Sequence, residues 1–195
     1  MNNWWCIWEN RLTPELCAEI IRIGSEIPDM EAQVGGRKET ANDGQVIENS
    51  RRSKIKFFDF ANTNHKVLFN LVFEHATAAN RSTFGFDISQ TVDVQYTKYL
   101  ASDKGFYNWH EDITWCNQNM YQRKLSFSAQ LSDPDSYEGG DLVFDLPDEL
   151  CPPREALRKL GTVIIFPSFV RHMVTPVTKG ERHAMVSWVE GLNFR

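Results

Sequence analysis

Apolar residues recur at the helical period in two stretches of the N-terminal part of the chain. The first stretch begins after Thr13 and Pro14, a helix N-cap and a residue suited to the first helical position. Its apolar stripe consists of Leu16, Ile20, Ile21 and Ile23. The pair Ile27-Pro28 ends this helix, because the residue before proline is disfavoured in helical conformation. The same period predicts a second helix over about residues 65–79, with Thr63 or Asn64 as its cap.

Residues 29–54, between the two helices, show no sustained period. They are polar and rich in glycine and asparagine. A connection of this length is uncommon in a compact domain unless it is disordered or has a function of its own. We therefore expect this segment to be a candidate lid.

From residue 92 the pattern changes to short runs of β-branched and aromatic residues, separated by Gly, Pro, Asp and Ser. The runs are TVDVQYTKYL, FYNWHED, RKLSFSAQLS, DLVFD, GTVIIFP, HMVTPV and RHAMVSWVEG. Short strands at this spacing, after a helical part, are typical of a sandwich or jelly roll buttressed by helices. We expect a mainly β fold of the α+β class, in a single domain over residues 1–195. Residues 1–91 would form the helical support, and residues 92–191 the jelly-roll core.

Composition narrows the class of protein. The 195 residues suit one domain with a sizeable core, and the net charge is −5 without a basic cluster longer than Arg51-Arg52-Ser53-Lys54. A nucleic-acid partner is therefore not expected, because it requires a basic face. No apolar run approaches the ~20 residues of a membrane span, and the N-terminus does not resemble a signal peptide. The four cysteines lack CxxC spacing, and we expect free thiols in a soluble cytoplasmic protein.

The stretch KGFYNWHEDITW places His110 and Asp112 two residues apart. In a strand, residues i and i+2 point to the same face, so these two side chains can converge while Glu111 faces away. A strand with one polar face would explain the pair without any metal. A metal site needs a third ligand, and His172 and His183 are the candidates, because the other two histidines fall on or near the predicted second helix.

Arg182 separates these candidates. It lies ten residues after His172, across the turn Thr178-Lys179-Gly180-Glu181, and a hairpin would bring it alongside His172. His183 would then point to the opposite face, which favours His172 as the ligand. Two imidazoles and one carboxylate form the facial triad of non-haem Fe(II) oxygenases, with positions open for a chelating cosubstrate and dioxygen. A 2-oxo acid also needs a cationic anchor, and the planar fork of Arg182 suits a carboxylate.

This pattern resembles the Fe(II)/2-oxoglutarate-dependent dioxygenases, in particular their prolyl 4-hydroxylase-like branch. The resemblance covers about residues 92–191. Its landmarks are Tyr99, Gly105, His110-x-Asp112, Leu131-Ser132, Gly139-Gly140-Asp141-Leu142-x-Phe144, Gly161-Thr162-x-Ile164-x-Phe166-Pro167-Ser168, His172-x-Val174-x-Pro176-Val177, Gly180-x-Arg182 and Trp188. The pair Arg52-Ser53 lies where the family often has an Arg-x-Ser-like segment facing the peptide substrate. One departure is the absence of a second tyrosine after the His-x-Asp motif, for which Ser128 or Gln130 could substitute.

The resemblance implies a double-stranded β-helix with Fe(II) bound by His110, Asp112 and His172. It implies that Arg182 and Tyr99 hold 2-oxoglutarate, that dioxygen is the oxidant and that ascorbate supports activity. Arg52 and Arg171 are the expected substrate contacts. The implied reaction is hydroxylation, most simply of a prolyl residue in a peptide or protein, with release of succinate and CO2. Two alternatives stay open: hydroxylation of another residue or a small metabolite, and a catalytically silent metal-binding jelly roll.

Overall fold

The computed structural model describes most of the chain. The residues outside the described part are 1–3, 28–29, 32–49, 114, 116–119 and 195. Most of the candidate lid therefore lies outside the described residues. Within the described part, no helix has the length and apolar character needed to cross a membrane.

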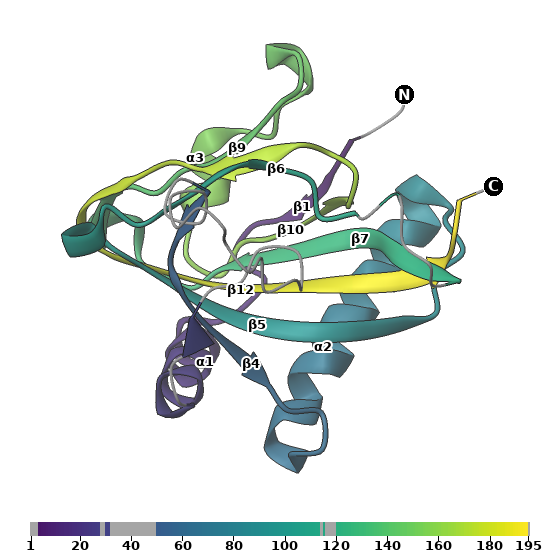
Figure 1. The fold of residues 1–195 in the computed structure, drawn as a ribbon, viewed down its shortest axis with the longest axis horizontal. Coiled ribbons are helices and arrows are strands. Elements are labelled where there is room, and N and C mark those ends of the chain that lie inside the picture. Colours follow the sequence, from purple (N-terminus) through teal and green to yellow (C-terminus); the bar gives the residue numbers. More distant parts are fainter. Residues whose placement is uncertain (1–3, 28–29, 32–49, 114, 116–119, 195) are drawn as a thin grey trace, which may run out of the picture.

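Two antiparallel β-sheets face each other in the molecule (Figure 1). The larger sheet has the order β1 (Cys6–Trp8), β10 (Val163–Pro167), β7 (Tyr121–Gln130), β12 (Val177–Leu192), β5 (Gln90–Leu100), β4 (Lys54–Phe58) and β2 (Met30–Glu31), and β8 (Tyr137–Gly139) pairs with β12. The smaller sheet has the order β3 (Arg51–Arg52), β6 (Phe106–His110), β11 (His172–Val174) and β9 (Leu142–Phe144). The expected mainly β fold with a jelly-roll core and N-terminal helices is confirmed.

The two long helices, α1 (Pro14–Glu26) and α2 (Thr63–Ala79), cover the outer face of the larger sheet (Figure 1). The Thr13 hydroxyl accepts a hydrogen bond from the Leu16 amide at 3.2 Å, as expected for an N-cap. The cap of α2 is instead Asn62, whose side chain accepts from the Asn64 amide at 3.0 Å. The remaining helical elements are short: η1 (Asn80–Phe84), η2 (Ala101–Asp103), η3 (Pro134–Ser136), η4 (Asp148–Leu150) and α3 (Arg154–Arg158).

The segment before residue 92, expected to be helical, also contributes strands to both sheets. Strands β1, β3 and β4 come from this segment and are two to five residues long. Elements this short contain too few residues to display a period in the sequence, so their pairing with distant strands decides their conformation. The core and its support are therefore interleaved along the chain.

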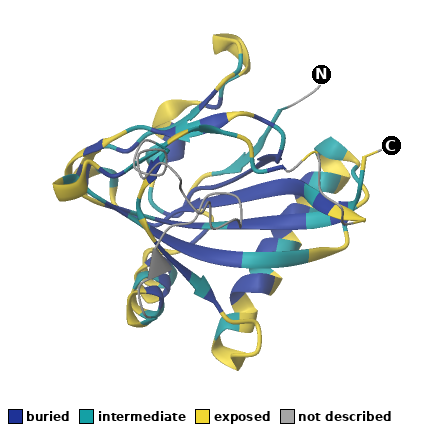
Figure 2. Cartoon of the chain, in the orientation of Figure 1, coloured by how far each residue is buried: buried dark blue, intermediate teal, exposed yellow. Residues whose placement is uncertain are grey.

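The main hydrophobic core lies between the helices and the larger sheet (Figure 2). Ile20 and Val72 of the helices are fully buried there against strand residues such as Phe127 and Met185. Along β7 the sequence LSFSA alternates strictly, so its apolar residues face the helices and its serines face the space between the sheets. This alternation leaves a polar lining on the inner face of the larger sheet.

Candidate metal centre

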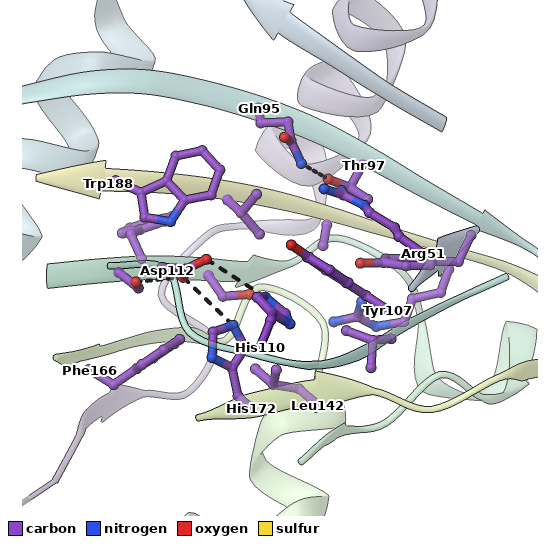
Figure 3. A pocket seen from close by; sticks show the side chains of 18 residues that line it. Arg51, Gln95, Thr97, Tyr107, His110, Asp112, Leu142, Phe166, His172 and Trp188 are labelled. Carbon is purple, nitrogen blue, oxygen red and sulfur yellow. Dashed lines mark hydrogen bonds and ion pairs between the residues drawn. The ribbon is translucent and has the colours of Figure 1, made fainter. Parts of the chain in front are cut away.

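His110, Asp112 and His172 converge at one point between the two sheets (Figure 3). His110 ends β6 and His172 begins β11, and the two residues are directly paired across these strands. Asp112 follows β6. The Nε2 atom of His110 is 3.7 Å from one Asp112 oxygen, and the Nε2 atom of His172 is 3.6 Å from the other. All three ligand atoms lie within 4.8 Å of one another, which suits a single metal ion.

Each imidazole is oriented by the backbone carbonyl two residues before it. The Nδ1–H of His110 donates to the Asn108 carbonyl at 2.8 Å, and that of His172 donates to the Val170 carbonyl at 2.9 Å. A carbonyl oxygen can only accept, so both protons must reside on Nδ1. The lone pair of each Nε2 therefore points to the shared centre, as in metal-ligating histidines generally.

Ser126 of β7 and Ser168, which follows β10, together hold Asp112. The Ser126 hydroxyl donates to an Asp112 oxygen at 2.7 Å, and its own oxygen lies 3.0 Å from that of Ser168. The Ser168 carbonyl accepts hydrogen bonds from the amides of Asp112 and Ile113 at 2.9 and 3.1 Å. The carboxylate thus enters the centre in a fixed orientation.

The electrostatics of the centre favour the protonation states that a cation requires. Burial is the main cause that lowers the pKa of His110 to about 4, and the neighbouring His172 adds to it. Burial raises the pKa of Asp112, but the two imidazoles and the Ser126 hydrogen bond outweigh it, so this pKa lies below its usual value. At neutral pH His110 is therefore a neutral donor and Asp112 an ionised one. This donor set fits a divalent first-row metal with imidazole and carboxylate ligands.

A cavity extends from the three ligands along the inner face of the larger sheet (Figure 3). Arg182 and Tyr99 line it from paired positions on β12 and β5. Both side chains are only 4% exposed, and the Arg182 guanidinium carbon lies 5.6 Å from the centre of the Tyr99 ring. Among the residues that the structure describes, no carboxylate pairs with Arg182. A buried guanidinium in this state is a ready binding group for a carboxylate ligand.

Gly140 makes room for Arg182. It has a φ of +64°, and a Cβ atom there would meet the Arg182 Cδ at 3.0 Å and the Val177 Cγ2 at 2.9 Å. The preceding Gly139 also has a positive φ, and a Cβ there would collide with the Pro176 carbonyl. This glycine pair therefore serves a turn and a close approach of strands.

The other residues named from the sequence differ in whether they line the cavity. His183 faces away from the cavity, where its Nδ1 lies 2.6 Å from the Tyr96 hydroxyl. Arg52 and Arg171 are exposed and do not line the cavity, so their assignment as substrate contacts stays a prediction. Ser128 lines the cavity, whereas the side-chain amide of Gln130 lies elsewhere and donates to the Tyr137 hydroxyl and the Ser132 carbonyl.

Ser126, Arg51 and Tyr107 are among the cavity residues that were not identified from the sequence. Ser126 could have been found, because the LSFSA alternation places it on the polar face with Ser128. Arg51 lines the cavity in place of its neighbour Arg52, and β3 is too short for the sequence to reveal which arginine points inward. Tyr107 also lines the cavity, although strict alternation would put it on the face opposite His110.

Comparisons with known proteins agree with this geometry. Residues 94–190 match the family model described as the 2OG-Fe(II) oxygenase superfamily. The PKHD-type hydroxylase YbiX of Escherichia coli is 31% identical over 163 residues, which cover 82% of this chain and 68% of the relative. PKHD-type hydroxylases from three other organisms match over shorter segments, and there this chain spans only 30 to 40% of the relative's length.

Solved structures with the same fold cover nearly the whole chain. A Pseudomonas putida prolyl-4-hydroxylase superposes with a TM-score of 0.70 at 18% identity, covering 98% of this chain and 94% of that one. A Trichoplax adhaerens prolyl hydroxylase, solved in complex with a hypoxia inducible factor oxygen degradation domain peptide fragment, gives a TM-score of 0.69 at 20% identity. That match covers 96% of this chain and 83% of the other. At these identities the likeness concerns the fold.

Proposed function

The chain belongs to the 2OG-Fe(II) oxygenase superfamily, and from this premise we propose that it hydroxylates a prolyl residue in a peptide or protein. One observation carries the proposal: a two-His, one-carboxylate cluster shares a cavity with a buried arginine that has no carboxylate partner among the described residues. The names of the PKHD-type relatives and of the prolyl hydroxylases that share the fold support the prolyl substrate. The peptide complex of the Trichoplax protein supports a peptide partner.

In this proposal His110, Asp112 and His172 hold Fe(II). The iron, with 2-oxoglutarate and dioxygen, would supply the oxidising chemistry of hydroxylation, with succinate and CO2 as co-products. The protein contributes the arrangement of the donors. The Nδ1 hydrogen bonds of the imidazoles and the Ser126 hydrogen bond to Asp112 orient them before any metal binds.

Arg182 and Tyr99 would hold 2-oxoglutarate on the larger sheet. The fork of a guanidinium can form two parallel hydrogen bonds with a carboxylate, and burial excludes the water that would weaken them. Trp188 of β12 also lines the cavity and is buried. Trp109 and Trp115 do not line the cavity, whereas Trp188 does.

Turnover of 2-oxoglutarate is the direct test. Purified protein with Fe(II), ascorbate and 2-oxoglutarate should release succinate slowly, and proline-containing peptides should increase that release. Mass spectrometry should then find one added oxygen on proline in a peptide library. His110→Ala and Asp112→Ala should abolish both signals. Succinate release without any modified proline would overturn the prolyl substrate, and no succinate under any condition would overturn the enzymatic proposal itself.

A further inference from the structure

Strand β6 carries a bulge immediately before the first metal ligand. Opposite β11, His110 pairs with His172 and Tyr107 pairs with Val174, so three steps along β6 match two along β11. The extra residue lies at Asn108-Trp109. The Asn108 side chain accepts a hydrogen bond from the Trp109 amide at 2.8 Å, and the Asn108 amide donates to the Ser50 carbonyl at 2.8 Å. A bulge re-aims the side chains that follow it, and here it turns Tyr107 and His110 to the same face.

The result is a stack of three flat groups along the cavity wall (Figure 3). The rings of Tyr107 and His110 lie nearly parallel, with centroids 3.5 Å apart and planes inclined by 16°. On the opposite side of Tyr107 lies the guanidinium of Arg51, with its carbon 4.5 Å from the ring centre. Arg51 is 9% exposed and is tethered by its Nε, which donates to the Ser53 hydroxyl at 2.6 Å.

Each contact removes one freedom of the His110 ring. The Asn108 carbonyl fixes the Nδ1–H, but a single hydrogen bond still permits the imidazole plane to tilt. The Tyr107 ring blocks this tilt on one face. Arg51 holds Tyr107 in place through a cation–π contact, which is favourable when the cation is desolvated. The other ligand histidine has aromatic neighbours of a different kind, because Phe166 meets the His172 ring edge-on at a centroid distance of 4.8 Å.

We propose that Tyr107, backed by Arg51, is a positioning residue that holds the His110 imidazole in its metal-binding orientation. This inference rests on the metal site of the proposed function. Supporting contacts of metal ligands typically change metal affinity by about 10- to 100-fold when they are removed. The stacked Tyr107 ring would raise metal affinity without touching the metal. It restricts the His110 ring before binding, so less conformational entropy is lost when the metal binds.

The same two strands supply matched controls. One residue earlier along β6, Phe106 pairs with Arg52 of β3, as Tyr107 pairs with Arg51. The Arg52 guanidinium carbon lies 5.8 Å from the centre of the Phe106 ring. This second cation–π pair lies outside the cavity. Phe106→Leu and Arg52→Met therefore remove the same kind of contact from the same strands without reaching His110.

Metal affinity measured without cosubstrate tests the inference. Calorimetric titration with Mn(II) should show about 10- to 100-fold weaker binding for Tyr107→Leu. Arg51→Met should bind about 2- to 10-fold more weakly. Tyr107→Phe, which keeps the ring, should bind like the wild type, as should Phe106→Leu and Arg52→Met. At saturating Co(II), the visible absorption spectrum of Tyr107→Leu should differ from that of the wild type. The spectra of Tyr107→Phe and Phe106→Leu should match the wild type.

The outcomes separate the two proposals. Wild-type protein that binds neither Mn(II) nor Co(II) would contradict the proposed function. Wild-type protein that binds metal, with Tyr107→Leu binding equally well, would overturn the positioning role alone. Equal losses in Tyr107→Phe and Tyr107→Leu would also overturn it, because the hydroxyl and not the ring would then be responsible. If Tyr107→Leu does not fold, the comparison of Arg51→Met with Arg52→Met decides the question, and equal affinities there reject the stack.

Discussion

The two sheets of this protein contribute to the cavity in different ways. The larger sheet has strands of up to 16 residues, and Ser126, Tyr99 and Arg182 lie on its inner face where its pairing is continuous. The register shifts of β12 fall elsewhere, near its start and around Val189. The smaller sheet has strands of two to five residues and a bulge, yet it carries both ligand histidines. The main hydrophobic core, which includes the helices, packs against the outer face of the larger sheet and does not reach the smaller sheet.

Side chains on the two sheets are therefore positioned by different means. On the larger sheet the continuous pairing around Tyr99, Ser126 and Arg182 fixes the direction of each side chain. On the smaller sheet the ladder is too short to do so, and local contacts take over. The Nδ1 hydrogen bonds to Asn108 and Val170 and the stack on Tyr107 are such contacts. We therefore expect substitutions on the larger sheet to affect cosubstrate binding, and those on the smaller sheet to affect the metal.

The largest effect should come from Arg182 on the larger sheet. Arg182→Met removes the buried cation, and losing one partner of a buried charge pair costs about 2 to 5 kcal/mol. We expect a corresponding loss of 2-oxoglutarate affinity, measured by calorimetry in the presence of Mn(II), while Mn(II) affinity itself stays at the wild-type value. Arg171→Met is the control, because Arg171 is exposed and pairs with Asp145 at 3.1 Å. A parallel loss of metal affinity in Arg182→Met would break the division between the sheets.

His183, on the face of the larger sheet turned away from the cavity, should affect stability and not metal binding. Burial is the main cause that lowers the pKa of His183 to about 4, helped by Lys98 and Arg182 and opposed by Glu181. The unfolded chain therefore binds a proton at a higher pH than the folded one. Stability from this group is complete above about pH 6.5 and is lost as the pH falls towards 4.

The expected loss from His183 is up to about 3 kcal/mol over that pH range. Urea unfolding of the metal-free protein between pH 7 and 4.5 should reveal it, and the slope should be shallower for His183→Gln. Metal affinity at neutral pH should be the same in both proteins, because His183 lies on the face turned away from the cavity. An unchanged pH slope in His183→Gln would contradict the assignment.

A smaller effect on metal affinity is expected at Ser126, where a residue of the larger sheet contacts the metal ligand Asp112. Ser126→Ala removes the hydrogen bond to Asp112, and hydrogen bonds to charged groups contribute about 1.5 to 3 kcal/mol. Mn(II) affinity should fall accordingly. Ser128→Ala, two residues along the same face of β7, should leave Mn(II) affinity unchanged. Equal affinities in the two variants would mean that Asp112 is held by its backbone hydrogen bonds to Ser168 alone.

The sequence predicted which side chains meet in the cavity, but not in every case the element that brings them there. His110 and Asp112 are two residues apart and their side chains converge, although Asp112 lies beyond the end of β6. The expected hairpin turn at residues 178–181 is wrong, because these residues belong to the continuous strand β12 of the larger sheet, whereas His172 lies in β11 of the smaller sheet. Arg182 and His172 line the same cavity from the two opposite sheets. The alternation along β12 also correctly turned His183 away. The arrangement of residues 1–195 as one domain stays a prediction.

The sequence could not predict the parts of the site in which alternation fails or a strand is too short to show it. The bulge brings Tyr107 to the face of His110, and nothing in the letters FYNWH indicates an extra residue in the ladder. The choice of Arg51 over Arg52 depends on how the two-residue strand β3 pairs with β6. Both depend on partners distant in the sequence.

The dependence of 2-oxoglutarate binding on metal shows whether the three ligands and Arg182 form one site. If a metal binds His110, Asp112 and His172 beside a carboxylate anchor at Arg182, both parts must act on one ligand molecule. Under anaerobic conditions, calorimetry should find one 2-oxoglutarate per chain, bound at least tenfold more tightly with Fe(II) than without it. His172→Ala should remove this difference. Equal 2-oxoglutarate affinity with and without Fe(II) in the wild-type protein would mean that the metal ligands and Arg182 do not form one site.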